Sequence, residues 1–162
     1  RMGADALLLT GETAIGKYPI DAIRWLERII RKAEESGTFV KKREPRDLFD
    51  RFARGVVLMA DSIDGKVMAY TKSGITARRI SSFRPKNGVL TATSSLEVAR
   101  RISLLWGVFG IHLSHLADKE DPTKDIVDEF KRAGLLKAGD IVVITRGVKA
   151  GATDAVRILE VP

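Results

Sequence analysis

The sequence predicts an α/β fold, a three-layer α/β/α domain with a mostly parallel five-stranded sheet, and three observations support this prediction. From Lys66 onwards, short apolar or β-branched runs alternate with amphipathic helical patterns, which is typical of a parallel sheet covered on both faces. The loop between the last two strand patterns is too short for a parallel crossover, so the last strand of this mixed sheet should be antiparallel. A separate β-α fragment, which begins with an apolar run at residues 6–9, precedes the domain.

The β-α fragment near the N-terminus is expected to belong to a larger fold. Residues 6–9 predict a fully buried strand, and a hydroxyl, a glycine and a carboxylate follow at residues 10–12, where α/β folds place active-site residues. A helix is predicted over residues 19–35, because Pro19 suits a first helical turn and apolar residues recur along one face. A buried parallel strand needs neighbours on both sides, so we expect the chain to begin inside a domain whose other strands lie elsewhere.

A charged connector at residues 41–45 marks the predicted boundary between the two parts of the chain. Residues 1–45 would form the first part, and residues 46–162 would form the three-layer domain. The length of 162 residues agrees with one complete domain plus a fragment, since domains usually span about 100–200 residues.

Each element of the second part has a local signal in the sequence. Asp47 can cap the first helix, Ser94 and Glu97 match a capping box, and Asp121 followed by Pro122 is a helix start. The predicted helices span residues 47–62, 75–82, 94–105 and 121–134. The predicted strands span residues 66–71, 89–92, 108–113, 141–145 and 155–161. The first of these helices should bury Leu48, Phe49, Phe52, Ala53, Val56, Val57 and Ala60.

Composition restricts the classes of protein that the chain can represent. At 44% hydrophobic residues the chain can build a core, and the absence of cysteine excludes disulfides and thiolate metal sites. No apolar run reaches the roughly 18 residues of a membrane span, and no signal-peptide pattern opens the sequence. These observations favour a cytoplasmic protein that has no membrane partner.

Positive charge is concentrated in one segment. The formal net charge is +7, and residues 72–101 carry seven basic residues against one acid, so this segment accounts for +6. A concentrated basic segment indicates an anionic ligand, whereas arginines on solvated helix faces or in subunit contacts are the alternative. The basic residues are Lys72, Arg78, Arg79, Arg84, Lys86, Arg100 and Arg101.

The loop between the first predicted strand and helix of the domain has the composition of a phosphate site. Thr71, Ser73 and Thr76 supply hydroxyl groups, Lys72 adds charge, and Gly74 allows close approach of the backbone. The helix that follows would offer unpaired N–H groups and a partial positive charge to an anion. The alternative is that Ser73 or Thr76 only caps the helix.

Two other groups of residues could suggest a metal site. His112 and His115 have helical spacing but lie in or next to a predicted strand, and the sequence offers no evident third ligand. Asp118, Glu120 and Asp121 are acidic neighbours, although capping a helix is a sufficient role for Asp121. No metal site is therefore predicted in this chain.

Two motifs resemble the pyruvate kinases. Residues 10–14 (Thr-Gly-Glu-Thr-Ala) and 16–19 (Gly-Lys-Tyr-Pro) are similar to the last strand and helix of that family's catalytic barrel, with Thr10 in place of the usual serine. Residues 70–78 and 83–86 resemble the family's C-terminal domain, and the resemblance covers nearly the whole chain. It implies that residues 1–45 are a C-terminal fragment of the (β/α)8 catalytic barrel and that residues 46–162 are the allosteric domain.

The resemblance implies roles for particular residues. The phosphate of an allosteric effector would bind Thr71, Lys72, Ser73, Gly74 and Thr76. A lid over the effector would include Arg146, Gly147, Lys149 and Gly151. Thr10 and Glu12 would be a catalytic remnant at the barrel mouth, inactive in this chain alone.

The activity implied by the resemblance is phosphoryl transfer from phosphoenolpyruvate to ADP, which gives pyruvate and ATP in glycolysis. The parent enzyme would use Mg and K, held by parts of the barrel outside this chain, and so no cofactor is expected here. The implied partners are a phosphorylated metabolite or nucleotide effector, the remainder of the barrel, and other subunits of a tetramer. The lid lacks the tryptophan of fructose-bisphosphate-regulated relatives, so a sugar or nucleotide monophosphate is at least as compatible an effector.

Functions from two other classes remain open at this point. The segment Ser73-Gly74-Ile75-Thr76 also resembles the phosphate loop of sugar isomerase domains, which would make the chain a stand-alone phosphosugar-binding module or an isomerase. Nucleic-acid binding through the basic segment is the other class, but only ten of 162 residues are aromatic and no nucleic-acid motif is visible. Nucleic acid is therefore not expected as a partner.

Overall fold

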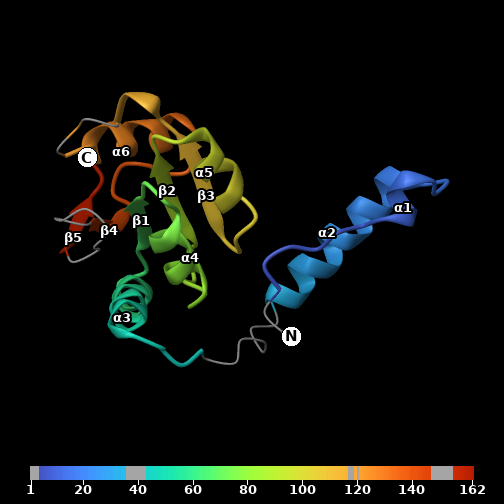
Figure 1. Cartoon of the computed structure of the whole chain (residues 1–162), viewed down its shortest axis with the longest axis horizontal. Coiled ribbons are helices and arrows are strands. Elements are labelled where there is room, and N and C mark those ends of the chain that lie inside the picture. Colours follow the sequence, from blue (N-terminus) through green and yellow to red (C-terminus); the bar gives the residue numbers. More distant parts are fainter. Residues whose placement is uncertain (1–3, 36–42, 117–118, 120, 147–154) are drawn as a thin grey trace. The chain divides into compact units, whose positions relative to one another are not determined.

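The computed structural model describes residues 4–35, 43–116, 119, 121–146 and 155–162. The chain divides into two compact units, Arg1–Arg43 and Glu44–Pro162, which we call unit 1 and unit 2 (Figure 1). The division falls within the charged connector at residues 41–45. Within the described ranges, no helix combines the length and the apolar character that crossing a membrane requires.

Unit 1 contains a short helix, α1 (Gly11–Ala14), and a long helix, α2 (Pro19–Glu35), whose bounds match the predicted helix. The strand predicted at residues 6–9 is not formed, and Leu7 and Leu8 in that segment are 57% and 87% exposed. The physical reason is that a strand is held by hydrogen bonds to a neighbouring strand. The described part of unit 1 contains no second strand that could supply them.

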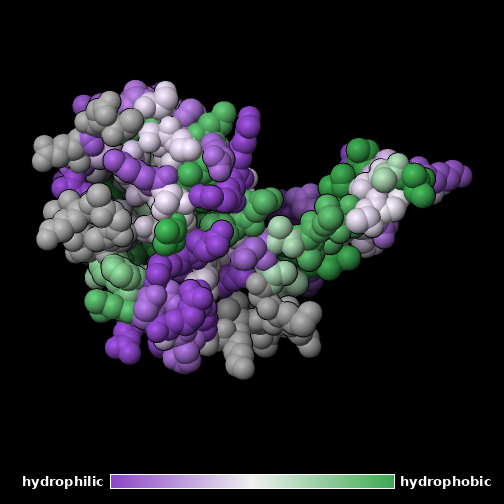
Figure 2. Space-filling model, in the orientation of Figure 1, coloured by the Kyte–Doolittle hydropathy of each residue, from purple (hydrophilic) through white to green (hydrophobic). Residues whose placement is uncertain are grey.

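Helix α2 presents apolar side chains that the described residues of unit 1 leave exposed. None of its residues is buried, and Ile20, Ile23 and Trp25 are each at least half exposed. Figure 2 shows this apolar surface in green over the helices that Figure 1 labels α1 and α2. Charged residues on α2 form ion pairs along the helix, such as that between Glu27 and Arg31 at 2.7 Å. The helix is therefore amphipathic, and its apolar face lacks a partner within the described part of its own unit.

Unit 2 is built on the predicted five-stranded mixed sheet. The strands are β1 (Lys66–Tyr70), β2 (Val89–Thr93), β3 (Val108–His112), β4 (Ile141–Arg146) and β5 (Ala155–Glu160). Their order across the sheet is β3-β2-β1-β4-β5. All neighbours are parallel except β4 and β5, which run antiparallel as the short connection predicts.

Helices cover both faces of this sheet and give the predicted three layers (Figure 1). The helices of unit 2 are α3 (Leu48–Ser62), α4 (Ile75–Ser81), α5 (Leu96–Ile102), the short 3-10 helix η1 (Ser114–Leu116) and α6 (Thr123–Arg132). Val67 and Ala69 of β1 pack on the face that α3 and α4 cover, and α5 packs beside α4. Met68 packs on the opposite face, with Phe130 of α6. The central strand is thus buried on both sides.

Local signals placed the cap of α3 correctly but misplaced both ends of α5. The carboxylate of Asp47 accepts a hydrogen bond from the Asp50 backbone N–H, as predicted for a cap. The cap of α5 is Ser95, not Ser94, because Ser95 has the extended backbone that lets its hydroxyl accept from the Val98 N–H. Helix α5 also ends at Ile102, which is earlier than predicted.

The buried face of α3 differs from the prediction at its first turn. Leu48 and Phe49 were expected inside, but they are 73% and 44% exposed. Asp50 is fully buried instead, on the same face as Ala53 and Val57. Spacing of three to four residues places these side chains on one side of a helix, and the apolar pattern alone assigned the first turn to the wrong side. This buried carboxylate pairs with Arg79 of the neighbouring helix α4 at 3.1 Å.

Candidate anion-binding site

The strand order creates one position where ligands usually bind in open α/β sheets. Strands β1, β2 and β3 follow one another toward one edge, and β4 then pairs on the other side of β1. Such a reversal leaves a crevice outside the carboxyl ends of the two strands at which it occurs. Here these strands are β1 and β4, and Ala69 lies opposite Thr145 near their ends. The predicted phosphate loop follows β1, and Arg146 ends β4, so topology brings both to the same edge.

The loop after β1 is held in a defined conformation by Thr71 and Gly74. The hydroxyl of Thr71, a buried residue, accepts a hydrogen bond from the Gly74 backbone N–H at 2.9 Å. Gly74 caps α4 with a φ of 80°, in the left-handed region that favours glycine. A Cβ atom at this position would lie 2.8 Å from Cγ2 of Ile102 on α5. The loop therefore requires glycine both for its backbone angle and for its close contact with α5.

Ser73 lies at the exposed side of this loop. Its hydroxyl accepts a long hydrogen bond of 3.5 Å from the Ile75 N–H, and its carbonyl accepts one of 2.6 Å from the Arg101 guanidinium. Arg101 belongs to α5 and is exposed, so the guanidinium brings a positive charge to the loop from a second element. Sequence reasoning included Arg101 in the basic segment but not in the site. The 28 residues that separate it from Ser73 leave no local signal of their contact.

The other basic residues of the segment fall into two groups. Arg79 and Lys86 form ion pairs with carboxylates, and Arg84 stacks over the Trp106 ring at 5.0 Å. Lys72, Arg78 and Arg100 are exposed, Lys72 within the loop itself. Both interpretations of the basic segment therefore describe part of it, since some cations stabilise unit 2 and others face solvent.

Arg146, the first predicted lid residue, lies near an acidic side chain. It ends β4, and its guanidinium is 3.5 Å from the carboxylate of Asp121. The guanidinium of Arg157 lies 4.0 Å from the same carboxylate. Hydrogen bonds from Thr123 chiefly, and then the two arginines, lower the pKa of Asp121. Asp121 accepts the Thr123 N–H at 3.1 Å, but the N-cap of α6 is Pro122, one residue after the predicted cap. Gly147, Lys149 and Gly151 lie outside the described residues.

The predicted catalytic remnant lies in unit 1. The Thr10 backbone N–H donates to a carboxylate oxygen of Glu12 at 3.2 Å, and both residues are exposed. Backbone hydrogen bonds from Glu12 itself and from Thr10 lower the pKa of the Glu12 carboxyl. The carboxylate is thus ionised at neutral pH, and the contact with Thr10 passes through the backbone rather than the hydroxyl.

Among the described residues, the two histidines do not come together with further metal ligands. Asp118 and Glu120 lie outside the described residues. The His112 ring is 3.2 Å from the Ser94 carbonyl oxygen, and the His115 ring lies 3.9 Å from the Asp125 carboxylate. The described residues contain no group of three or more histidine, cysteine or acidic side chains that could hold a metal ion.

Comparison with known proteins identifies relatives of the chain. It is 32% identical to the pyruvate kinase of Geobacillus stearothermophilus, over 98% of this chain and 28% of that protein. It is 33% identical to the pyruvate kinase of Pyrobaculum aerophilum, over 93% of this chain and 30% of that protein. The chain thus spans about a third of the length of these relatives.

Solved structures agree with these relatives. A crystal structure of a pyruvate kinase from Cryptosporidium parvum matches with a TM-score of 0.80 and 26% identity, over 95% of this chain and 32% of the other. The crystal structure of the Pyrobaculum aerophilum pyruvate kinase matches with a TM-score of 0.73 and 29% identity, over 98% and 35%. Residues 50–159 match the family described as "Pyruvate kinase, alpha/beta domain". The chain therefore belongs to the pyruvate kinase family, through that α/β domain.

Proposed function

We propose that the chain is the C-terminal part of a pyruvate kinase and that unit 2 binds a phosphorylated effector of that enzyme. The parent reaction would be phosphoryl transfer from phosphoenolpyruvate to ADP, giving pyruvate and ATP. The observation that carries the effector site is the glycine-capped loop at residues 71–76, at the switch point between β1 and β4. Family membership accounts for this loop and for the Gly-Glu-Thr-Ala segment together, whereas a sugar isomerase would account only for the loop.

The loop would recognise a phosphate group through several donors. Backbone N–H groups near Gly74, the hydroxyls of Ser73 and Thr76, and Lys72 provide the direct contacts, while Thr71 holds the loop from within. A phosphate accepts such bonds with all its oxygens, and charge-assisted bonds are about twice as strong as neutral ones. The Arg101 guanidinium beside Ser73 adds a second cation. One compact loop suits one phosphate, which favours a sugar or nucleotide monophosphate.

Arg146 would contribute to closure over the effector. Its ion pair with Asp121 is partly exposed, and such pairs stabilise a protein by only about 0–1 kcal/mol. An effector phosphate could therefore attract the guanidinium away from Asp121 at little cost. Gly147, Lys149 and Gly151 would form the rest of the lid in this proposal.

The remaining functions belong to the whole parent enzyme. Residues 1–45 would complete its catalytic barrel, with Thr10 and Glu12 at the barrel mouth, and residues 46–162 would form its allosteric domain. The enzyme would use Mg and K, and it would assemble as a tetramer in the cytoplasm. By resemblance to the family, these ions would be held by parts of the catalytic barrel outside this chain. This chain alone would not transfer phosphate.

Thermal unfolding of the chain in the presence of phosphorylated compounds tests the effector site. The panel would contain glucose 6-phosphate, ribose 5-phosphate, fructose 1,6-bisphosphate, AMP, 3-phosphoglycerate and inorganic phosphate. A compound present at 100 times its dissociation constant should stabilise the chain by about 2.7 kcal/mol. The Ser73→Ala/Thr76→Ala variant should lose this stabilisation. Ser62→Ala/Ser103→Ala is the matched control, because these hydroxyls bond only to local helix carbonyls.

Three outcomes of this experiment have distinct meanings. Stabilisation by one compound that only the loop variant loses would establish the site and the class of effector. Equal stabilisation of wild type and loop variant would place the anion elsewhere. Absence of stabilisation by every compound, in a chain that unfolds cooperatively, would contradict an effector site within this chain.

A further inference from the structure

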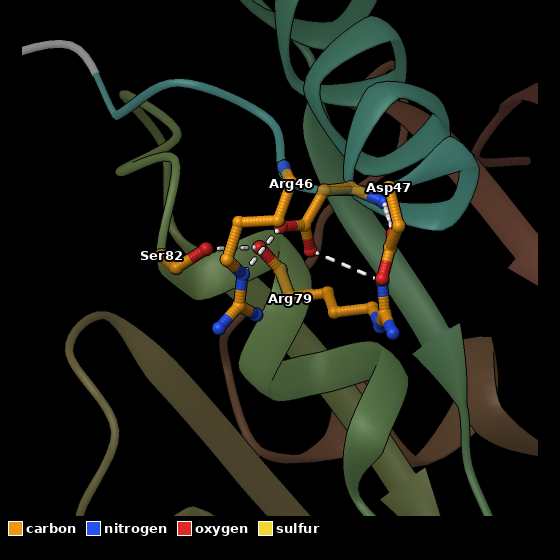
Figure 3. A network of polar contacts seen from close by, with 5 residues as sticks. Arg46, Asp47, Arg79 and Ser82 are labelled. Atoms are coloured by element: carbon orange, nitrogen blue, oxygen red, sulfur yellow. Dashed lines mark hydrogen bonds and ion pairs between the residues drawn. The ribbon is translucent and has the colours of Figure 1, made fainter.

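A network of charged residues joins the start of unit 2 to helix α4. Figure 3 shows Arg46 and Asp47, which precede α3, beside Arg79 and Ser82 from the end of α4. The Arg79 guanidinium lies 2.5 Å from the carboxylate of Asp47 and 3.1 Å from that of Asp50. Arg46 contributes two bonds to Asp50, from its backbone N–H at 3.2 Å and from its side chain at 3.0 Å. We call Arg46, Asp47, Asp50 and Arg79 the α3–α4 clamp.

The clamp is built around a fully buried carboxylate. The Asp50 side chain has 0% exposure, whereas Arg79 is 24% exposed and Arg46 is 71% exposed. A buried carboxylate is costly unless charged partners and hydrogen bonds satisfy it. The Arg79 guanidinium also lies over the Phe49 ring at 5.4 Å, which limits where it can move. Asp50 therefore holds α3 and α4 in one relative position.

The apolar contacts between the two helices are less specific than this network. Ile80 of α4 packs in the same cluster as Ala53, Val56 and Val57 of α3. Such contacts are non-directional, so they tolerate small sliding movements better than hydrogen bonds to a buried charge. The best-supported role of buried polar groups is to specify one packing register among several. The clamp fixes the register that the apolar contact leaves less defined.

Helix α4 connects the clamp to the loop at residues 71–76. It spans only Ile75–Ser81, about 10 Å of helix, with Gly74 at its start and Arg79 near its end. A helix this short moves as one body. Gly74 is in turn fixed by its hydrogen bond to Thr71 and by its contact with Ile102. A displacement at either end of α4 must therefore be accommodated at the other.

We propose that the α3–α4 clamp couples the conformation of the loop at residues 71–76 to residues 44–47, the segment by which unit 2 continues from the preceding chain. Arg79 is the positioning residue of this coupling, since its guanidinium links α4 to the carboxylates of both Asp47 and Asp50. The mechanical coupling stands independently of any ligand, while its regulatory meaning rests on the proposed effector site. In that case, a phosphate bound at the loop would change the order of residues 44–47.

Amide hydrogen exchange of the ligand-free chain tests the coupling. Arg79→Met removes the guanidinium and keeps a long apolar side chain, and Arg78→Met is the matched control at an exposed neighbouring position. In Arg79→Met, we expect exchange at the Arg46, Asp50 and Gly74 amides to accelerate by about tenfold. Arg78→Met should leave all three unchanged. The Val67 and Val143 amides of the buried sheet report global unfolding and allow its contribution to be subtracted.

The Gly74 amide decides the outcome, because it lies outside the network and bonds to Thr71. Acceleration at Arg46 and Asp50 with no change at Gly74 would reduce the clamp to a local contact and overturn the proposal. If Arg79→Met does not fold, Arg79→Lys serves instead, since it keeps the charge but loses the guanidinium fork. A smaller acceleration at the same three amides is expected there, and none at Gly74 would again overturn the coupling.

A second arm with ligand separates this inference from the proposed function. Saturating glucose 6-phosphate or AMP should protect the Gly74 amide and also the Arg46 amide in wild type, and only the Gly74 amide in Arg79→Met. Protection at Gly74 without any change at Arg46 in wild type would contradict the coupling. Absence of protection at Gly74 with every probe would contradict the effector site, while the ligand-free arm still decides the coupling.

Discussion

The two units of the chain differ in how far they bury their apolar residues. Unit 2 buries the large side chains of its sheet and helices, including Phe130 and Met68, with almost no exposure. Unit 1 has a regular 17-residue helix, yet none of the residues in α2 is buried and Trp25 is 62% exposed. A regular helix alone does not distinguish the units, since both contain long helices, whereas burial does.

The difference in burial indicates that unit 2, rather than unit 1, carries its own determinants of folding. Most helical stability in proteins comes from packing of an amphipathic face rather than from intrinsic propensity. Helix α2 has such a face but packs on no core among the described residues of unit 1, so its stability should depend on a partner surface. In the proposed parent enzyme that surface would be the rest of the catalytic barrel. Unit 2 contains its core and its candidate site together.

Separating the units should have the largest effect. A chain of residues 44–162 should unfold cooperatively with nearly the midpoint of the full chain, because the core of unit 2 is internal. A peptide of residues 1–43 should show little helix, since most helical stability comes from packing of an amphipathic face, and the peptide offers no core for that face of α2. Circular dichroism of both chains measures this. A cooperative thermal transition in residues 1–43 would contradict this difference between the units.

Removing one aromatic side chain from each unit should give very unequal losses of stability. Phe130→Ala should reduce the free energy of unfolding by about 3–5 kcal/mol, since Phe130 is fully buried against the sheet. Trp25→Ala should change it by less than about 0.5 kcal/mol, because the side chain is mostly exposed. Urea unfolding of the full chain compares the two. Similar losses for both variants would show that Trp25 is packed after all.

Replacing one glycine in each unit by alanine should change the free energy of unfolding by unequal amounts. Gly74→Ala should destabilise the chain by about 1–3 kcal/mol, because it adds strain at positive φ and a contact of 2.8 Å with Ile102. Gly11→Ala should be neutral or slightly stabilising, since a Cβ there meets nothing within 4 Å. The measurement is again urea unfolding. An unaffected Gly74→Ala variant would mean that the loop is not held as described.

Acidification should weaken unit 2 more than unit 1, with the smallest of these effects. A hydrogen bond from Arg79 chiefly, and one from the Asp50 N–H, lower the pKa of Asp47 from 3.8 to about 2. A carboxyl with a lowered pKa stabilises the folded state above its unfolded pKa, and this contribution is lost as pH falls through the folded pKa. Stability should therefore fall between about pH 4 and pH 2.

Urea unfolding at pH 7, pH 4 and pH 2.5 measures this dependence. The pKa values of Asp64, Asp125 and Asp140 in unit 2 are also lowered, by hydrogen bonds from lysines above all, so they add to the same slope. Asp47→Asn should flatten the dependence without removing it. A variant as sensitive to acid as wild type would contradict the assigned role of Asp47.

The sequence predicted what depends on local signals and failed where partners are distant. The helix of residues 19–35 and the strands of unit 2 were predicted nearly to the residue, because periodicity, caps and turns lie within each element. The prediction of a strand at residues 6–9 was wrong because a strand needs hydrogen bonds from another strand. Ser94 and Ser95 carry the same hydroxyl, and only the backbone angles decide which one caps α5.

The candidate site was predictable in its loop and not in its surroundings. Thr71, Ser73 and Gly74 formed a recognisable pattern, and the structure gives Gly74 the positive φ that explains the glycine. The contact of Arg101 with Ser73 and the burial of Asp50 depend on residues 28 and 29 positions away. No local rule predicts such pairs. The pairing of these residues in the clamp was therefore visible only in three dimensions.

Unit 2 is expected to hold an anion site at the loop of residues 71–76 without help from unit 1. Titration of the isotope-labelled full chain with glucose 6-phosphate, and separately with AMP, followed by two-dimensional amide NMR, tests this most directly. We expect saturable shifts for at least one probe that centre on residues 72–76 and Arg146, with α2 unchanged. Shifts confined to other elements, or no shifts with either probe, would contradict it.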